Sequence, residues 1–220
     1  MLTRRHFIVT SAALFSSQAI SLPTSAEAAT QSQKWAAWDA QVTPLDYDPA
    51  TSNPWGLHPR FLPARVEANP GLTPGSIHVD AVARYIYHIQ PDGTAMRYGV
   101  AIGKGDLYIP GTYTIRVKKK WPSWTPTKAM IKREPHKYKQ HENGMAPGPQ
   151  NPLGSRAFYL YKGSRDTYLR IHGTPNPGSI GSQASSGCVR MVMAHINGLY
   201  PHVATGSTAT LYPKRVTYTS

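Results

Sequence analysis

The chain is poor in cysteine, in acidic residues and in long apolar segments. Cys188 is the only cysteine among 220 residues, so no disulfide bond can form within the chain. Eleven Asp and Glu stand against 24 Lys and Arg. After residue 28, no apolar run approaches the roughly 20 residues that a membrane-spanning helix needs. These shortages exclude a disulfide-stapled scaffold and predict a mature chain without a transmembrane segment.

The excess of basic residues points to an anionic environment. The formal net charge is +13 at pH 7. Nucleic acid, a phospholipid surface and a carboxylate-bearing cell-wall polymer all meet that condition, and charge alone does not choose among them. With 40% hydrophobic and 10% aromatic residues, the chain has enough apolar material for one sizeable domain.

Residues 1–28 have the layout of an export signal. Two arginines precede an apolar stretch over residues 7–14, and a small-residue site follows at Ala26-Glu27-Ala28. The order Thr3-Arg4-Arg5-His6-Phe7-Ile8 resembles the twin-arginine signal, with which bacteria export proteins that have already folded. We therefore predict cleavage near residue 28 and a location in the periplasm or cell envelope. A retained membrane anchor is the alternative.

The mature chain divides by composition into two parts. Residues 29–73 are rich in proline and show no helical or strand periodicity, which predicts a linker or a surface strap pinned by Trp35, Trp38 and Trp55. From residue 74 on, short runs rich in β-branched and aromatic residues alternate with turns. Seven strands are predicted, within residues 76–80, 84–90, 95–103, 111–117, 156–162, 167–173 and 207–213.

The predicted fold class is therefore mainly β, a sandwich or partly closed barrel with one or two short helices. Gln90-Pro91-Asp92-Gly93 is typical of a hairpin turn. Apolar residues at 196, 199, 200 and 203 have the spacing of one helix after the cysteine.

A basic insertion over residues 116–154 interrupts the strand pattern. Nine of its first 24 residues are Lys or Arg. It is interpreted either as a solvated surface excursion or as a lid that carries Trp121 and Trp124 over a groove and attracts an anionic polymer.

Cys188 and His172 are the candidate catalytic residues. A free thiol with a pKa near ~8.5 is mostly protonated at neutral pH, so a nucleophilic cysteine needs a base or a cationic neighbour. His172 ends a predicted strand, and the glycine-rich loop that follows is flexible enough to bring the two side chains together. The alternative is a small, buried and inert cysteine.

The residues around Cys188 add candidate roles. Gly187 permits close approach of the backbone, and the N–H groups of Ser186, Gly187 and Cys188 are candidate donors to a tetrahedral oxyanion. Arg190 is positioned to hold a substrate carboxylate or to lower the pKa of the thiol.

The stretch "HGTPNPGSIGSQASSGCVRM", residues 172–191, resembles the active-site signature of the bacterial L,D-transpeptidase catalytic domain of the YkuD type. The similarity extends upstream to "GMAPGPQNPLGSRAFYLY" and "PGSIHVDAVARYIY", so a catalytic domain over residues 74–214 is predicted, with the basic insertion inside it. The resemblance implies acyl transfer on the tetrapeptide stems of peptidoglycan. The acceptor would be the amine of another stem, of a protein or of a D-amino acid.

The resemblance also implies roles for individual residues. Cys188 would be the nucleophile and His172 the general base, with the carbonyl of Gly173 orienting the imidazole. Ser185 fills the usual Ser or Thr position of the signature. Many members have His where this chain has Ser186, so the side chain of Ser186 is expected to be dispensable. No metal, no cofactor and no nucleic-acid partner are expected.

Three other functions compete with this interpretation. A sortase-like transpeptidase also orders His, Cys and Arg, but the sequence around Cys188 differs from a sortase motif. A metal-dependent wall hydrolase would have to use His136, His141 and Glu142, which lack a zinc signature. A non-catalytic basic module that binds wall polymer or nucleic acid is the third; nucleic-acid binding would weaken steeply with salt.

Overall fold

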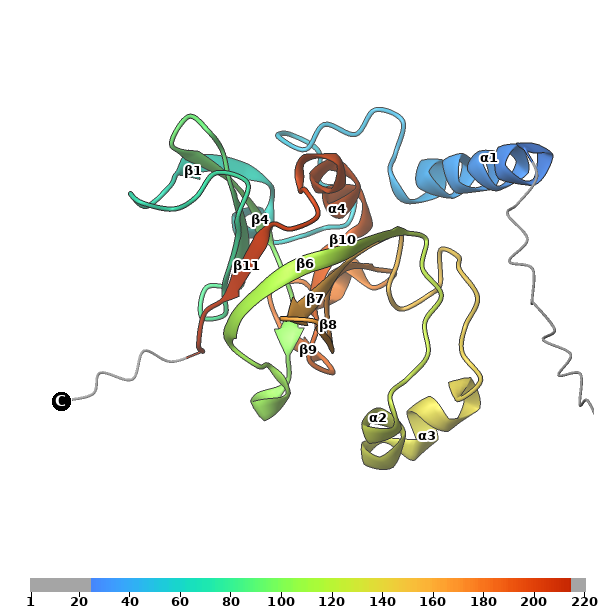
Figure 1. Ribbon diagram of the computed structural model, residues 1–220. Coiled ribbons are helices and arrows are strands. Elements are labelled where there is room, and N and C mark those ends of the chain that lie inside the picture. The colour runs from blue at the N-terminus through green and yellow to red at the C-terminus, as the bar shows by residue number, and fades with distance from the viewer. Residues whose placement is uncertain (1–24, 215–220) are drawn as a thin grey trace, which may run out of the picture.

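The computed structural model describes residues 25–214 (Figure 1). Most of the predicted export signal lies outside the described residues. The helices are α1 (Ser25–Val42), α2 (Lys128–Arg133), α3 (Pro135–Tyr138) and α4 (Met193–Leu199). The strands are β1 (Ala64–Glu67), β2 (Ile77–Asp80), β3 (Tyr85–Ile89), β4 (Thr94–Gly99), β5 (Ile102–Gly103), β6 (Gly111–Lys120), β7 (Arg156–Lys162), β8 (Arg165–Thr174), β9 (Gln183–Ser185), β10 (Val189–Val192) and β11 (Thr208–Leu211).

Nine strands form one mixed sheet in the order β1-β4-β3-β2-β11-β6-β7-β8-β10, and β5 pairs with β9 in a small second sheet. Most neighbours are antiparallel, whereas β11 runs parallel to β2 and β10 runs parallel to β8. The predicted mainly β fold is thus confirmed. The predicted hairpin is also confirmed, because β3 and β4 pair across residues 90–93.

The main core lies between the two halves of the sheet. Ile77 and Ile86 from one half, Phe158 and Ile171 from the other, and Ile196 from α4 belong to one cluster of fully buried side chains. The side chains of a strand alternate between its two faces. The opposite face of β7 and β8 is therefore free to carry polar residues.

Three strands, β1, β9 and β10, and three helices, α1, α2 and α3, were not located from the sequence. β1, β9 and β10 are three or four residues long, too short for a clear alternating pattern. The prediction that residues 29–73 hold no helix is wrong, because α1 covers residues 25–42. Alanine, glutamine and lysine in this stretch have high intrinsic helix propensity, so the helix forms without a broad apolar stripe. Among the described residues, no helix has the length and apolar character needed to cross a membrane.

The basic insertion begins later than predicted. Arg116 to Lys120 continue strand β6, which pairs with β7 as far as Lys120 opposite Arg156. The remaining excursion, residues 122–154, is called the lid segment below; it contains α2 and α3. Trp121 is buried at its base rather than on it. The prediction that a lid carries both Trp121 and Trp124 is therefore wrong for Trp121.

The segment after α1 packs on α4 around His195, which is 2% exposed. The rings of Trp55, Tyr98 and Tyr47 lie 5.5, 5.9 and 6.1 Å from the imidazole, centroid to centroid. Within the described residues, neither ring nitrogen of His195 has a hydrogen-bond partner. Burial lowers the pKa of His195 to about 4. The imidazole is therefore neutral in the folded chain, and Trp55 holds the segment to the core as predicted.

We expect His195→Phe to reduce the slope with which the free energy of unfolding falls as the pH drops below about 6.5. An unfolded histidine titrates near ~6.5, so between that pH and about 4 the unfolded state alone takes up the proton. The free energy of unfolding then falls by about 1.4 kcal/mol per pH unit for this one group. Urea denaturation at a series of pH values measures the slope, with the exposed His136→Phe as control. An unchanged slope in His195→Phe would contradict the assignment.

Candidate active site

A cleft of about 680 Å³ opens beside Cys188, between the polar face of the sheet and the lid segment. The sheet contributes Tyr159, Arg170, His172, Cys188 and Arg190. The lid segment forms the facing wall, with Trp124, Met130, Arg133, Lys137 and Tyr138.

The pairing of β10 with β8 brings the two candidate catalytic residues together. The strands are parallel, with Val189 opposite Ile171 and Arg190 opposite His172. Val189 and Ile171 are fully buried in the core. Because faces alternate along a strand, His172 and Arg190 point to the other face. Cys188, one residue before Val189, lines the same cleft as both of them.

His172 is a neutral base held in one tautomer. Its residue exposure is 4%, and its Nδ1 lies 2.6 Å from the carbonyl oxygen of Gly173. A carbonyl only accepts, so Nδ1 carries the hydrogen and Nε2 keeps its lone pair. Burial, followed by the charges of Arg190 and Arg170, lowers the pKa of His172 to about 3. The imidazole is thus neutral at neutral pH, with Nε2 as its acceptor atom.

The Cys188 thiol is half-buried and protonated. Its Sγ lies 3.8 Å from the carbonyl oxygen of Tyr168, to which the S–H donates. Burial raises the pKa of the thiol, while the backbone N–H and the charge of Arg170, with the charge of Arg190, oppose that rise. The sulfur therefore needs a base before it becomes nucleophilic.

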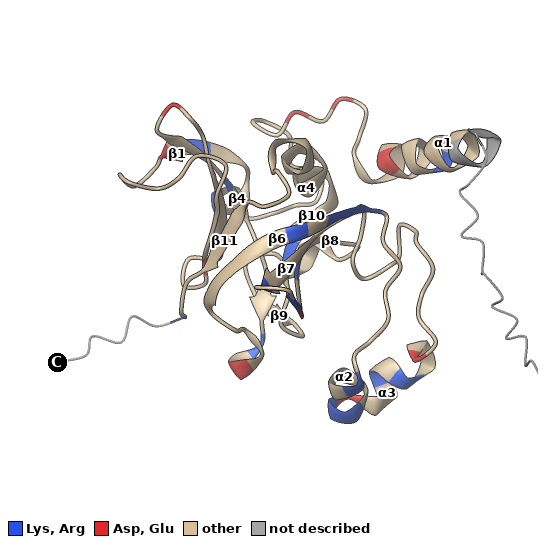
Figure 2. Ribbon diagram, viewed as in Figure 1, with Lys and Arg blue, Asp and Glu red and all other residues tan. Residues whose placement is uncertain are grey.

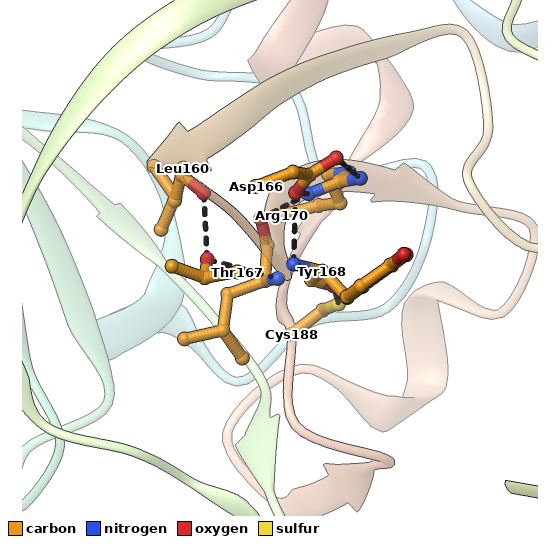
Figure 3. A network of polar contacts seen from close by, with 7 residues as sticks. Leu160, Asp166, Thr167, Tyr168, Arg170 and Cys188 are labelled. Carbon is orange, nitrogen blue, oxygen red and sulfur yellow. Dashed lines mark hydrogen bonds and ion pairs between the residues drawn. The ribbon is translucent and has the colours of Figure 1, made fainter. Parts of the chain in front are cut away.

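A polar network on β8 holds the backbone that faces the sulfur (Figure 3). The Asp166 carboxylate accepts two hydrogen bonds from the Arg170 guanidinium, at 2.7 and 2.8 Å, and one from the Tyr168 N–H at 2.8 Å. Thr167 Oγ1 donates to the Leu160 carbonyl at 2.6 Å. Tyr168 has a φ of +59°, a strained value for a bulky residue. The network maintains this conformation and so directs the Tyr168 carbonyl toward Cys188.

The serines before Cys188 shape the loop around it. Ser185 is buried; its hydroxyl donates to the Cys188 carbonyl at 2.5 Å and accepts from the Gly187 N–H at 3.2 Å. Gly187 has a φ of +132°, and a Cβ there would lie 3.0 Å from the Leu107 carbonyl oxygen. Glycine is therefore required at this position. Its N–H, predicted as an oxyanion donor, is engaged by Ser185.

The side chain of Ser186, expected to be dispensable, touches the lid segment. Its Oγ lies 2.7 Å from the hydroxyl oxygen of Tyr138 at the end of α3. Tyr138 is 5% exposed, and its ring packs against Trp124, with 6.1 Å between centroids. The hydroxyl of Ser186 thus joins the loop of Cys188 to the facing wall.

Arg190 is poised for an anion. Its Nε lies buried and, among the described residues, without a hydrogen-bond partner. Burial lowers the pKa of the guanidinium, which the neighbouring Cys188 and Tyr138 partly offset. Arg133 and Lys137 on the facing wall add positive charge, visible on α2 and α3 in Figure 2. The cleft therefore favours a substrate that carries a carboxylate.

All seven residues singled out from the sequence lie in or beside this cleft: His172, Gly173, Ser185, Ser186, Gly187, Cys188 and Arg190. Sequence reasoning missed Asp166, Tyr168 and Arg170 on β8, and Tyr138 on the lid segment. Arg170 lies two residues before His172, so strand alternation alone places it on the same face. His136, His141 and Glu142 form no metal-binding cluster. Within residues 25–214, no group of three or more His, Cys, Asp or Glu side chains is arranged to hold a metal ion.

We expect Arg190→Met to move the titration of the Cys188 thiol to higher pH. The guanidinium favours the thiolate, so its removal leaves the raising effect of burial less opposed. Because Cys188 is the only cysteine, the rate of iodoacetamide alkylation against pH reports this one group. Arg190→Lys, which keeps the charge, serves as the matched control. A midpoint that stays in place or falls would refute the electrostatic role.

Comparison with known families gives a clear match. The family model of the L,D-transpeptidase catalytic domain, named YkuD, matches residues 74–215. A protein of Fuscovulum blasticum named as an L,D-transpeptidase is 38% identical over 102 residues, covering 46% of this chain and 49% of its own. The chain spans about half the length of the curated relatives that it matches first.

Two solved structures are also similar. A Brucella melitensis protein named as a carnitine operon oxidoreductase is 48% identical, with a TM-score of 0.49, over 69% of this chain and 93% of its own. The Ldtfm–avibactam carbamoyl enzyme has a TM-score of 0.50 at 13% identity, over 67% of this chain and 52% of its own. The second likeness concerns the fold alone.

Proposed function

The chain belongs to the L,D-transpeptidase catalytic-domain family, and we propose that it is a cysteine-dependent L,D-transpeptidase acting on the tetrapeptide stems of peptidoglycan. The observation that carries the proposal is the neutral, single-tautomer His172 on the same sheet face as the protonated Cys188. An acid–base pair of this kind needs no metal or cofactor to generate a nucleophile.

In the first half-reaction, His172 Nε2 takes the proton of the Cys188 thiol as the sulfur attacks the carbonyl carbon of the L-centre of a diamino acid in the stem. A tetrahedral oxyanion forms. As it collapses, the C–N bond to the terminal D-alanine breaks and His172 returns the proton to the departing amine. The product is a thioester on Cys188.

The oxyanion would be held by the backbone from Ser186 to Cys188. Each such donor contributes roughly 3 kcal/mol to transition-state stabilisation in other acyl transferases. The Gly187 N–H would have to exchange its 3.2 Å bond to Ser185 for one to the oxyanion. A bond of that length is weak, so the exchange costs little. Arg190, with its unpartnered Nε, would bind a carboxylate of the stem.

In the second half-reaction, an acceptor amine attacks the thioester, and the Cys188 thiol is restored by the proton that the amine loses. The amine of another stem gives a 3-to-3 cross-link; a protein amine or a D-amino acid are the other acceptors. Export by the signal in residues 1–28 would place the enzyme in the cell envelope, where these substrates are.

We expect a carbapenem to acylate the protein once, at Cys188. Intact-mass spectrometry should show a single covalent adduct that disappears in Cys188→Ala and forms at least about a hundredfold more slowly in His172→Ala, because a general base contributes 10²–10⁴-fold. A wild-type protein that stays unmodified while its thiol remains titratable would count against the mechanism. Wall binding that survives Cys188→Ala, without turnover by wild type, would favour a non-catalytic module.

We also expect a preference for stems whose diamino acid keeps a free side-chain carboxylate. Arg133 and Lys137 line the cleft, and exposed ion pairs contribute roughly 0.2–1 kcal/mol, or about 1.4- to fivefold in KM for each residue. Arg133→Gln and Lys137→Gln should each raise KM for the free acid and leave KM for the amidated stem unchanged. Lys132→Gln, on α2 beside Arg133 but outside the cleft, is the matched control. Equal KM values for the two stems in wild type would refute the preference.

A further inference from the structure

The two ends of the lid segment meet at one point. Trp121, which follows β6, donates its backbone N–H to the carbonyl oxygen of Ser155 at 2.7 Å. Ser155 directly precedes β7. Trp121 is 1% exposed and Ser155 is fully buried. Trp121 also has a φ of +44°, which is strained for a residue with a bulky side chain. Packing around this base must therefore maintain its conformation.

Helix α1, which lies outside the residues that match the family model, contacts both ends of this base. On one side, the Trp38 ring packs edge-on against Trp121, with 5.1 Å between centroids and 63° between planes. On the other side, the Asp39 carboxylate accepts hydrogen bonds of 2.9 and 2.6 Å from the Arg156 guanidinium. Arg156 also donates to the Ser155 carbonyl at 2.8 Å. Figure 1 shows the rest of α1 projecting from the domain.

The ion pair is enclosed on the arginine side. The Arg156 side chain is 8% exposed and that of Asp39 is 32% exposed. Asn197 on α4 reaches Asp39 at 3.4 Å and accepts a hydrogen bond of 2.6 Å from the Ser155 hydroxyl. Removing the carboxylate would leave a buried guanidinium without its counter-charge, which is more costly than the loss of an exposed pair.

The same base abuts the residue that orients His172. A Cβ on Gly154 would lie 2.7 Å from the carbonyl carbon of Gly173, so the two backbones are in direct contact. The Gly173 carbonyl accepts the Nδ1–H of His172. A displacement at the base of the lid segment would therefore move the facing wall of the cleft, and through Gly154 it would also shift the Gly173 carbonyl.

We infer that Trp38 and Asp39 of α1 clamp the base of the lid segment, and that this clamp holds the wall formed by α2 and α3 against the loop of Cys188, residues 185–188. Both are positioning residues, since they touch neither Cys188 nor the space where a substrate would bind. The consequence for catalysis rests on the proposed function, whereas the clamp itself does not depend on it.

Limited trypsin digestion of the full chain tests the clamp directly, because α2 carries the exposed Lys128 and Lys132. In Asp39→Asn, cleavage at these two sites should be about tenfold faster, because loss of a partly buried partner shifts the local opening equilibrium by at least that factor. Cleavage after Arg60 and Arg65, outside the lid segment, should be unchanged. Asp46→Asn, which makes the same change of charge away from the lid base, is the matched control.

Two further variants separate a clamp from general destabilisation. Trp38→Leu should accelerate cleavage within the lid segment like Asp39→Asn, and Asp39→Glu, which keeps the charge, should restore most of the protection. Equal acceleration at every tryptic site, or wild-type rates in both Asp39→Asn and Trp38→Leu, would overturn the proposal.

Kinetics with a tetrapeptide stem provide the catalytic readout. We expect KM to rise about fivefold in Asp39→Asn, with kcat within about twofold, because the lid segment forms a wall of the cleft while Cys188 and His172 stay on the sheet. A fall in kcat with unchanged KM would contradict the role assigned to the wall. If wild type shows no turnover, the proposed function fails, and the proteolysis results still decide the clamp.

Discussion

The parallel pairing of β10 with β8 is the constraint on which the site depends. It sets Arg190 opposite His172 and places Val189 and Ile171 in the core, so the burial of two apolar side chains determines where the polar ones point. A shift of β10 by one residue against β8 would turn Arg190 into the core while His172, held by the pairing of β8 with β7, stayed at the cleft. The arrangement of His172 and Arg190 is therefore as strongly specified as the core itself.

The same burial determines the charge states in the cleft. Desolvation keeps His172 neutral and Cys188 protonated, and two arginines moderate the second effect while strengthening the first. The burial that acts on both groups disfavours an ion pair of thiolate and imidazolium. The arrangement instead holds the proton on sulfur, and a protonated thiol is a poor nucleophile until a base removes that proton.

Elements far from the signature complete the cleft. The lid segment supplies the facing wall and touches the loop of Cys188 through Tyr138 and Ser186, and α1 packs against its base. Strand alternation predicted most of the sheet, because β-branched and aromatic runs of five or more residues carry a clear pattern. It missed β1, β9 and β10, which are short, and it missed α1, whose helix propensity comes from alanine rather than from an apolar stripe.

By itself, the sequence determined that the fold is mainly β and which six residues lie around Cys188, because a local signature and the alternation of a strand are both patterns of neighbouring residues. Tertiary structure alone decided how they act. The tautomer of His172, the engaged N–H of Gly187 and the contact of Ser186 with Tyr138 all depend on partners brought together by folding. Tyr138 and Ser186 are 48 residues apart. No pattern of nearby residues encodes such a contact, since it forms only when the lid segment lies against the sheet.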